Sequence, residues 1–154
     1  MWGGREGMEE RMRYLVLVSH GTLAPGMHSV LSMLGGARED VLSASLEDGM
    51  GADEYVARLK EVLAPVTAED EVVLLGDIIG GSPLTNALNT LNEKGLLGRT
   101  VAFGGMNLPM AMTALMGLQT SELPALAESM LQEAHDGARK IDIAPAADDD
   151  EDDI

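Results

Sequence analysis

The sequence of 154 residues predicts an α/β fold in three layers, with a parallel β-sheet covered by helices on both faces. Short apolar runs and segments with helical periodicity alternate four times along the chain, and the connections between them are short. Such alternation favours right-handed βαβ crossovers and a parallel sheet. Hydrophobic residues make up 45% of the chain, which at this length is sufficient for the core of one domain.

Four segments are expected to form the strands of this sheet: residues 14–18, 40–46, 72–75 and 100–103. Most of them are continuous apolar runs, which are typical of strands buried on both faces. Arg139–Ile143 instead alternates like a half-exposed strand and follows two consecutive helical segments. It cannot join the sheet as one more regular βα unit, so we expect it at a sheet edge, in this subunit or in a partner.

Apolar residues at helical spacing predict five helices: residues 27–34, 53–63, 82–92, 108–118 and 123–131. The third has the strongest start signal, with Ser82 as the expected N-cap and Pro83 at the first helical position. Ser121 is the expected cap of the fifth helix. The first helix is expected to stop at Gly35–Gly36.

The two ends of the chain differ in composition from its middle. Residues 1–12 are expected to be a disordered leader and residues 145–154 a disordered acidic tail, so the domain spans residues 13–144. The leader has no hydrophobic region like that of a signal peptide, and no apolar run in the chain approaches the length of a membrane span. The sequence has no cysteine, which excludes disulfides and thiolate metal sites. A cytoplasmic protein is expected.

The chain is strongly acidic, with a formal net charge of −16 at pH 7. Even without the acidic tail the domain carries an excess of Asp and Glu. Such a surface repels phosphate backbones and anionic lipid headgroups, so nucleic acid is not an expected partner. It favours encounter with a basic protein surface.

Three of the expected strands end in polar, glycine-rich turns, beginning at Ser19, Asp77 and Gly104. In an open parallel sheet these turns converge on one edge, where ligands bind. His20 follows the first strand and Asp77 follows the third. An isolated histidine in such a turn is more often a packing residue, but here a carboxylate occupies the equivalent position two strands later.

If the strand order reverses between the first and third strands, His20 and Asp77 face each other across the crevice. An aspartate that accepts the Nδ1–H of a histidine sets its tautomer and leaves Nε2 as a nucleophile. The turn Gly80–Gly81–Ser82 before a helix start is suited to binding an anion, although capping alone would also account for it. No Gly-Lys-Ser/Thr follows, so it is not a P-loop, and no residues have metal-ligand spacing.

Three motifs in order resemble the EIIA domain of the mannose-family sugar phosphotransferase system: Tyr14–Gly26, Gly76–Pro83 and Gly105–Met110. The resemblance covers about residues 13–143. It implies a four-stranded parallel sheet of order 2-1-3-4, with a C-terminal strand exchanged across a homodimer. It also implies that His20 is phosphorylated and Asp77 orients it. Ser82 would then lie at the phosphate, with Gly21, Gly80 and Gly81 around it.

The expected function is therefore that of a free-standing phosphocarrier. His20 would accept a phosphoryl group from the carrier protein HPr and pass it to a histidine of an EIIB subunit for sugar uptake, with no cofactor and no metal. Membrane transporter subunits would be contacted only indirectly. The alternatives are a phosphoryl donor for a dihydroxyacetone kinase, a serine hydrolase using Ser82, His20 and Asp77, or a non-enzymatic regulatory module.

Overall fold

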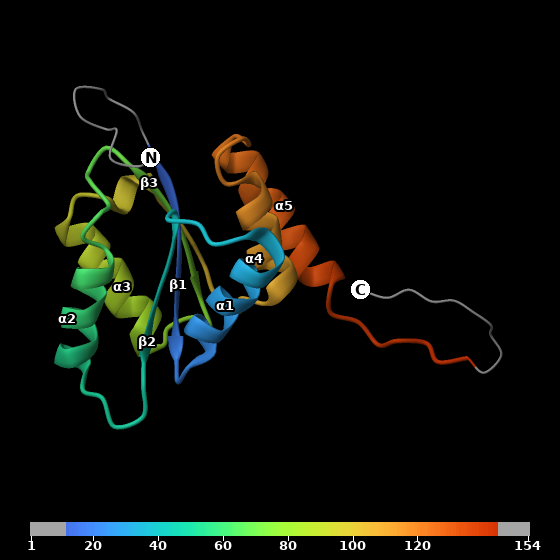
Figure 1. The fold of residues 1–154 in the computed structure, drawn as a ribbon, viewed down its shortest axis with the longest axis horizontal. Coiled ribbons are helices and arrows are strands. Elements are labelled where there is room, and N and C mark those ends of the chain that lie inside the picture. Colours follow the sequence, from blue (N-terminus) through green and yellow to red (C-terminus); the bar gives the residue numbers. More distant parts are fainter. Residues whose placement is uncertain (1–11, 145–154) are drawn as a thin grey trace.

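The four expected strands form one parallel sheet in the order β2-β1-β3-β4 (Figure 1). The computed structural model describes residues 12–144. Its strands are β1 (Arg13–His20), β2 (Val41–Leu46), β3 (Glu71–Gly76) and β4 (Thr100–Phe103). The predicted fold class and strand order are confirmed.

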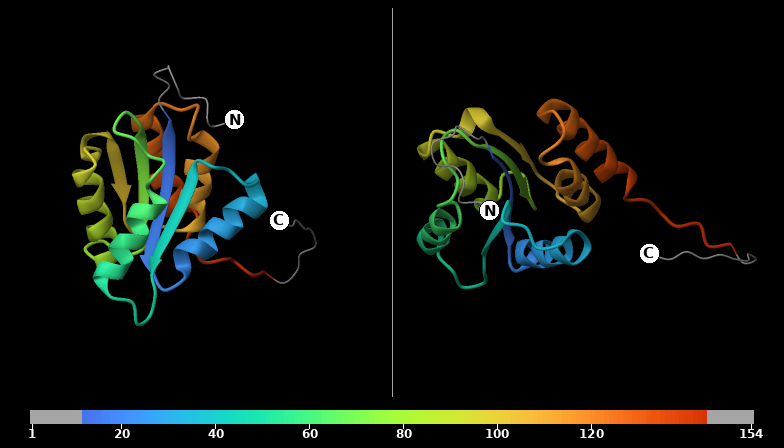
Figure 2. Two further views of the ribbon diagram at one scale, coloured as in Figure 1. Left: turned by 60° about the vertical axis from the view of Figure 1, so that its left-hand side comes forward. Right: turned by 45° about the horizontal axis from the view of Figure 1, so that its top comes forward.

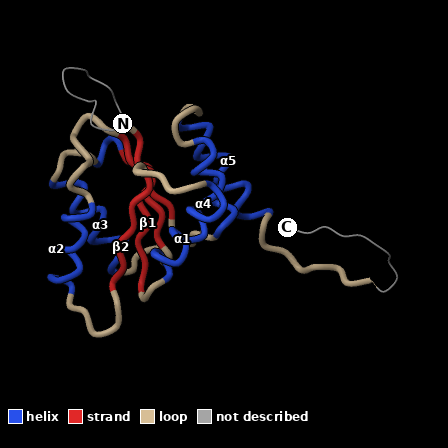
Figure 3. Tube along the Cα trace, in the orientation of Figure 1, coloured by secondary structure: helices blue, strands red, loops and turns tan. Residues whose placement is uncertain are grey.

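Helices cover both faces of the sheet, as Figures 2 and 3 show from different directions. The helices are α1 (Leu23–Gly35), α2 (Ala52–Val62), α3 (Ser82–Glu93), α4 (Leu108–Gly117) and α5 (Leu123–Asp136), with a short 3₁₀ turn η1 (Leu97–Arg99) before β4. α2 and α3 lie on one face, and α1, α4 and α5 lie on the other. None of these helices within residues 12–144 combines the length and the hydropathy needed to cross a bilayer.

The core is divided in two by the sheet, because successive side chains of a strand point to opposite faces. Leu15 and Leu17 of β1 pack with α1, α4 and α5, whereas Val16 and Val18 pack with α2 and α3. Both central strands, β1 and β3, are buried almost throughout. This burial explains why their sequences are continuous apolar runs.

The register of β1 and β3 brings the predicted site residues together. The two strands are parallel neighbours, and Val18 lies opposite Gly76. His20 follows Val18 by two residues, and Asp77 follows Gly76 directly. The reversal of strand order that the site required is therefore present between β1 and β3.

Three helix starts differ from the prediction. α1 begins at Leu23 rather than Met27, because the buried Ser19 Oγ accepts a hydrogen bond from the N–H of Ala24 at 2.7 Å. The N-cap of α3 is Gly81 and not Ser82, whose hydroxyl instead accepts from the Asn86 side chain at 3.0 Å.

The predicted N-cap of α5, Ser121, was also wrong. Glu122 occupies the N-cap, and no side chain caps this helix. Ser121 remains in the preceding turn, where its N–H donates to the Gly117 carbonyl at 3.0 Å.

Arg139–Ile143 forms no strand in this chain. The segment leads away from α5 in an irregular path (Figure 1), and Ile141 and Ile143 are 78% and 83% exposed. An edge position in its own sheet is therefore ruled out, while exchange with a partner stays a prediction. The expected tail and all of the expected leader except Met12 lie outside the described residues. Met12 itself packs with the domain, and its N–H donates to Asp70 at 3.0 Å.

Candidate active site

His20 and Asp77 are in direct contact at the carboxyl edge of the sheet. His20 Nδ1 lies 2.9 Å from Asp77 Oδ2. The same oxygen accepts the backbone N–H of His20 at 2.9 Å, and Oδ1 accepts the N–H of Ile78 at 2.9 Å. These three contacts hold the Asp77 carboxylate in one orientation against the imidazole.

The electrostatics of the pair favour an ionised carboxylate. Partial burial by itself would raise the pKa of the Asp77 carboxyl. The hydrogen bonds from the His20 backbone and imidazole, with the charge of the imidazole, outweigh this effect, so that the pKa is lowered from its ordinary value. An ionised Asp77 accepts the Nδ1–H of His20, and in the neutral imidazole the lone pair is then on Nε2.

The other side of the imidazole is open. The His20 side chain is 44% exposed, against 12% for Asp77, and among the described residues Nε2 has no hydrogen-bond partner. Gly81 lies against the ring: a Cβ built on this glycine would come within 2.9 Å of His20 Cε1. Gly81 is therefore needed for the close approach of the α3 terminus to the imidazole, and not only as a flexible residue.

The N-terminus of α3 is the helix end that faces this histidine, and no side chain caps it. The Ser82 N–H has no acceptor within the described part of the chain. The other two helices that begin beside the site turns differ, because Ser19 accepts from Ala24 in α1 and Asn107 accepts from Met110 in α4. The α3 terminus thus retains the free N–H of Ser82 and the positive end of the helix dipole, which together suit an anion.

The third glycine turn supports the site rather than lining it. The N–H of Gly105 donates to the Asp77 carbonyl at 3.1 Å, and the N–H of Met106 donates to the Gly76 carbonyl at 3.0 Å. Ile79 is seated directly on Gly104, where a Cβ would collide with its side chain. The sequence did not predict these supporting contacts, although the Gly104–Gly105 pair was a signal that a close approach occurs there.

Residues 14–131 match a family model, EIIA-man, which is described as the PTS system fructose IIA component. The chain belongs to the EIIA-man family. The resemblance inferred from the three motifs is therefore confirmed, and a general role in sugar phosphotransfer follows from membership.

Solved structures of similar proteins show that this EIIA-man chain has the fold of the family. The mannose/sorbose-specific IIA subunit from Enterococcus faecalis is 23% identical with a TM-score of 0.72, covering 88% of this chain and 99% of that one. The PTS IIA protein associated with the fucose utilization operon of Streptococcus pneumoniae is also 23% identical, with a TM-score of 0.72 and coverages of 86% and 96%. The EIIA component from Streptococcus agalactiae is 23% identical, with a TM-score of 0.71. The match covers 84% of this chain and 97% of that one.

An open hollow of about 320 Å³ lies beside the histidine of this EIIA-man domain. It is lined by His20, Gly21, Leu46, Glu47, Asp48, Gly49 and Met50. A larger hollow of about 450 Å³ between α4 and α5 contains none of the predicted site residues. Within residues 12–144, no group of three or more His, Asp or Glu side chains is arranged to hold a metal ion.

The nominal serine–histidine–aspartate set is only partly assembled. His20 contacts Asp77, but the Ser82 hydroxyl is bound by Asn86 and forms no hydrogen bond with His20. A hydrolase of this kind requires the base to contact the nucleophile. The geometry therefore favours chemistry at the histidine itself.

Proposed function

We propose that this EIIA-man chain is a phosphohistidine carrier. His20 accepts a phosphoryl group from phosphorylated HPr and passes it to a histidine of an EIIB subunit. The observation that carries this proposal is an imidazole held through Nδ1 by Asp77, with Nε2 exposed beside the uncapped terminus of α3. Family membership supports the same chemistry.

The transfer requires one bond to form and one to break. The Nε2 lone pair of His20 attacks the phosphorus, and the nitrogen–phosphorus bond of the donor histidine breaks, returning its electron pair to the donor ring. The Nδ1 proton of His20 stays in the hydrogen bond to Asp77, whose negative charge offsets the positive charge that develops on the imidazole. Transfer to EIIB is the same displacement, with His20 as the leaving group. Catalysis is then mostly positioning and charge stabilisation.

The turns around His20 would receive the phosphoryl oxygens. The Ser82 N–H and the dipole of α3 supply attraction for the anion. Gly21 and Gly80 have positive φ values of 60° and 82°, and nothing lies within 4 Å of a Cβ built on either. Together with Gly81 they leave the backbone open to a bulky tetrahedral group.

Intact-mass measurement tests this proposal. Incubation with phosphoenolpyruvate, enzyme I and HPr should add the mass of one phosphoryl group to the wild-type chain and none to His20→Ala. The adduct should be labile in acid and stable in alkali, as a phosphoramidate is, and addition of EIIB should remove it. An acid-stable adduct, or one that survives in His20→Ala, contradicts the proposal.

We further propose a cytoplasmic homodimer in which Arg139–Ile143 adds to the sheet of the partner. β4 is an edge strand with a free side, and Ile141 and Ile143 are exposed in the single chain. Strand exchange would cover the free side of β4 and bury the two isoleucines. Light scattering should find a dimer for a chain truncated after Ala147 and a monomer for one truncated after Asp136. A shorter chain that is equally dimeric overturns the exchange.

A further inference from the structure

Tyr55 lies beneath the candidate site, in the first half of α2. Its side chain is fully buried in the apolar cluster that contains Val18 and Leu84. Its hydroxyl donates a hydrogen bond to the backbone carbonyl of Pro83 at 2.8 Å. The phenol of α2 is thus tied to the first turn of α3.

The environment keeps this phenol a donor. Burial raises the pKa of the Tyr55 hydroxyl, and the charge of Asp77 raises it further. The hydroxyl therefore stays protonated at neutral pH and remains a hydrogen-bond donor.

The position of the acceptor gives this bond its significance. Pro83 directly follows Ser82, whose N–H is proposed to meet the phosphoryl group, and Gly81 lies against the imidazole of His20. The first turn of α3 has no side-chain cap to hold it. A bond from α2 to the Pro83 carbonyl restricts how far this turn can move relative to the imidazole.

We propose that Tyr55 is a positioning residue for phosphoryl transfer, which holds the first turn of α3 in the position where the Ser82 N–H meets a phosphoryl oxygen on His20 Nε2. The inference rests on the proposed function of His20. Tyr55 is fully buried, so it does not contact a docked partner protein. Its removal should therefore change the rate of transfer and leave docking of the partner unchanged.

Tyr55→Phe tests the proposal, because it keeps the ring and deletes only the donor. The chain contains a matched control in Tyr14, a second buried tyrosine of the same apolar cluster that lies near the start of β1. Both variants are compared with wild type for the maximal single-turnover rate with phosphorylated HPr and for the HPr concentration at half-maximal rate. Melting curves measure the structural cost of each substitution.

A second donor separates this inference from the proposed partner. Phosphoramidate transfers its phosphoryl group to an imidazole nitrogen as its own phosphorus–nitrogen bond breaks and ammonia leaves. If the wild-type chain is phosphorylated on His20 by phosphoramidate and not by HPr, the proposed partner is wrong and Tyr55 is judged on the small donor alone. If neither donor phosphorylates His20, both the function and the role of Tyr55 are overturned.

The expected result is a roughly tenfold lower maximal rate for Tyr55→Phe with either donor, since small displacements of reacting groups cost this much or more. The half-saturating HPr concentration should not change. The change in the Ser82 amide chemical shift on phosphorylation should become smaller, which a loss of stability alone would not produce. Tyr14→Phe should show none of these effects. Wild-type rates in Tyr55→Phe, or equal losses in both variants, overturn the inference.

Discussion

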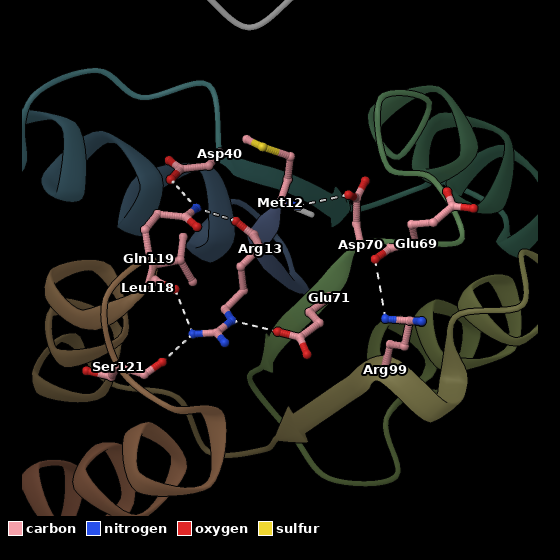
Figure 4. Close-up of polar contacts among 10 residues, drawn as sticks. All are labelled: Met12, Arg13, Asp40, Glu69, Asp70, Glu71, Arg99, Leu118, Gln119 and Ser121. Atoms are coloured by element: carbon pink, nitrogen blue, oxygen red, sulfur yellow. Dashed lines mark hydrogen bonds and ion pairs between the residues drawn. The ribbon is translucent and has the colours of Figure 1, made fainter. Parts of the chain in front are cut away.

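The amino and carboxyl ends of the parallel strands form two edges of the sheet, and the polar groups at these two edges are arranged differently. At the amino edge, polar side chains are paired with one another (Figure 4). Arg13 contacts Glu71 at 2.9 Å and the carbonyls of Leu118 and Ser121, while Gln119 bridges the Arg13 carbonyl and Asp40. At the carboxyl edge, His20 has one nitrogen paired and the other open. The amino edge thus stabilises the fold, and the carboxyl edge leaves one imidazole nitrogen available for the reaction proposed above.

A mostly buried aspartate lies at each edge, Asp40 at the amino edge and Asp77 at the carboxyl edge. For both Asp40 and Asp77, burial alone would raise the carboxyl pKa, and hydrogen bonds reverse the effect and lower it. The partners of Asp40 are Arg38, whose guanidinium is bound bidentately at 2.9 and 2.8 Å, and Gln119. The side-chain partner of Asp77 is the half-exposed imidazole of His20. The first arrangement fixes a loop, whereas the second orients the imidazole that we propose as the nucleophile.

Apart from loss of His20 itself, the largest expected effect comes from replacing the carboxylate at the carboxyl edge. Asp77→Asn should slow phosphorylation of His20 by about a hundredfold or more, because an amide does not enforce the Nδ1–H tautomer or offset the developing charge. The melting temperature should move by no more than a few degrees. Stopped-flow transfer rates and thermal melts measure both. Wild-type kinetics in a folded Asp77→Asn protein would remove this residue from the mechanism.

A smaller effect is expected where the α3 terminus meets the imidazole. Gly81→Ala should lower the transfer rate roughly tenfold, because the new methyl group displaces a ring that must stay in line. Gly98→Ala in η1 is the matched control at the opposite edge, since nothing lies within 4 Å of its Cβ and its φ is not positive. Equal rates for the two variants would show that the contact of Gly81 with His20 is unimportant.

Substitutions at the amino edge should have the reverse effect: they should lower the free energy of unfolding and leave the rate of phosphoryl transfer unchanged. Arg13→Met removes a mostly buried guanidinium from Glu71 and two carbonyls, which should lower the free energy of unfolding by about 2 kcal/mol. Lys60→Met, which breaks only the exposed contact with Glu93, should cost less than about 0.5 kcal/mol. Denaturant titration gives both values. A slower transfer in Arg13→Met at full stability would break the division between the two edges.

Local sequence was sufficient for the strands and for the chemistry-bearing turns. Burial on both faces requires a continuous apolar run, so the cores of β1 and β3 are visible in the sequence itself. Parallel pairing then places residues that follow such strands at one edge, which is why His20 and Asp77 were predicted together. The strand order 2-1-3-4 came from the family resemblance, because the periodicity of a strand does not specify its neighbours.

The caps of the helices and the long-range partners of polar groups could not be predicted from the sequence and are known only from the tertiary structure. Ser82 has the composition of an N-cap, but its hydroxyl is taken by Asn86, and the Ser19 hydroxyl extends α1 by one turn. The hydrogen-bond partners of Arg13 are 58 to 108 residues away in the sequence. The Tyr55 hydroxyl of α2 donates to the Pro83 carbonyl of α3. Alternation in Arg139–Ile143 indicates a strand but supplies no neighbour. Sequence thus determined what each segment can form and which polar groups are candidates for the chemistry. Tertiary packing decided which of several competent partners each polar group meets, because that choice depends on distances between segments far apart in the chain.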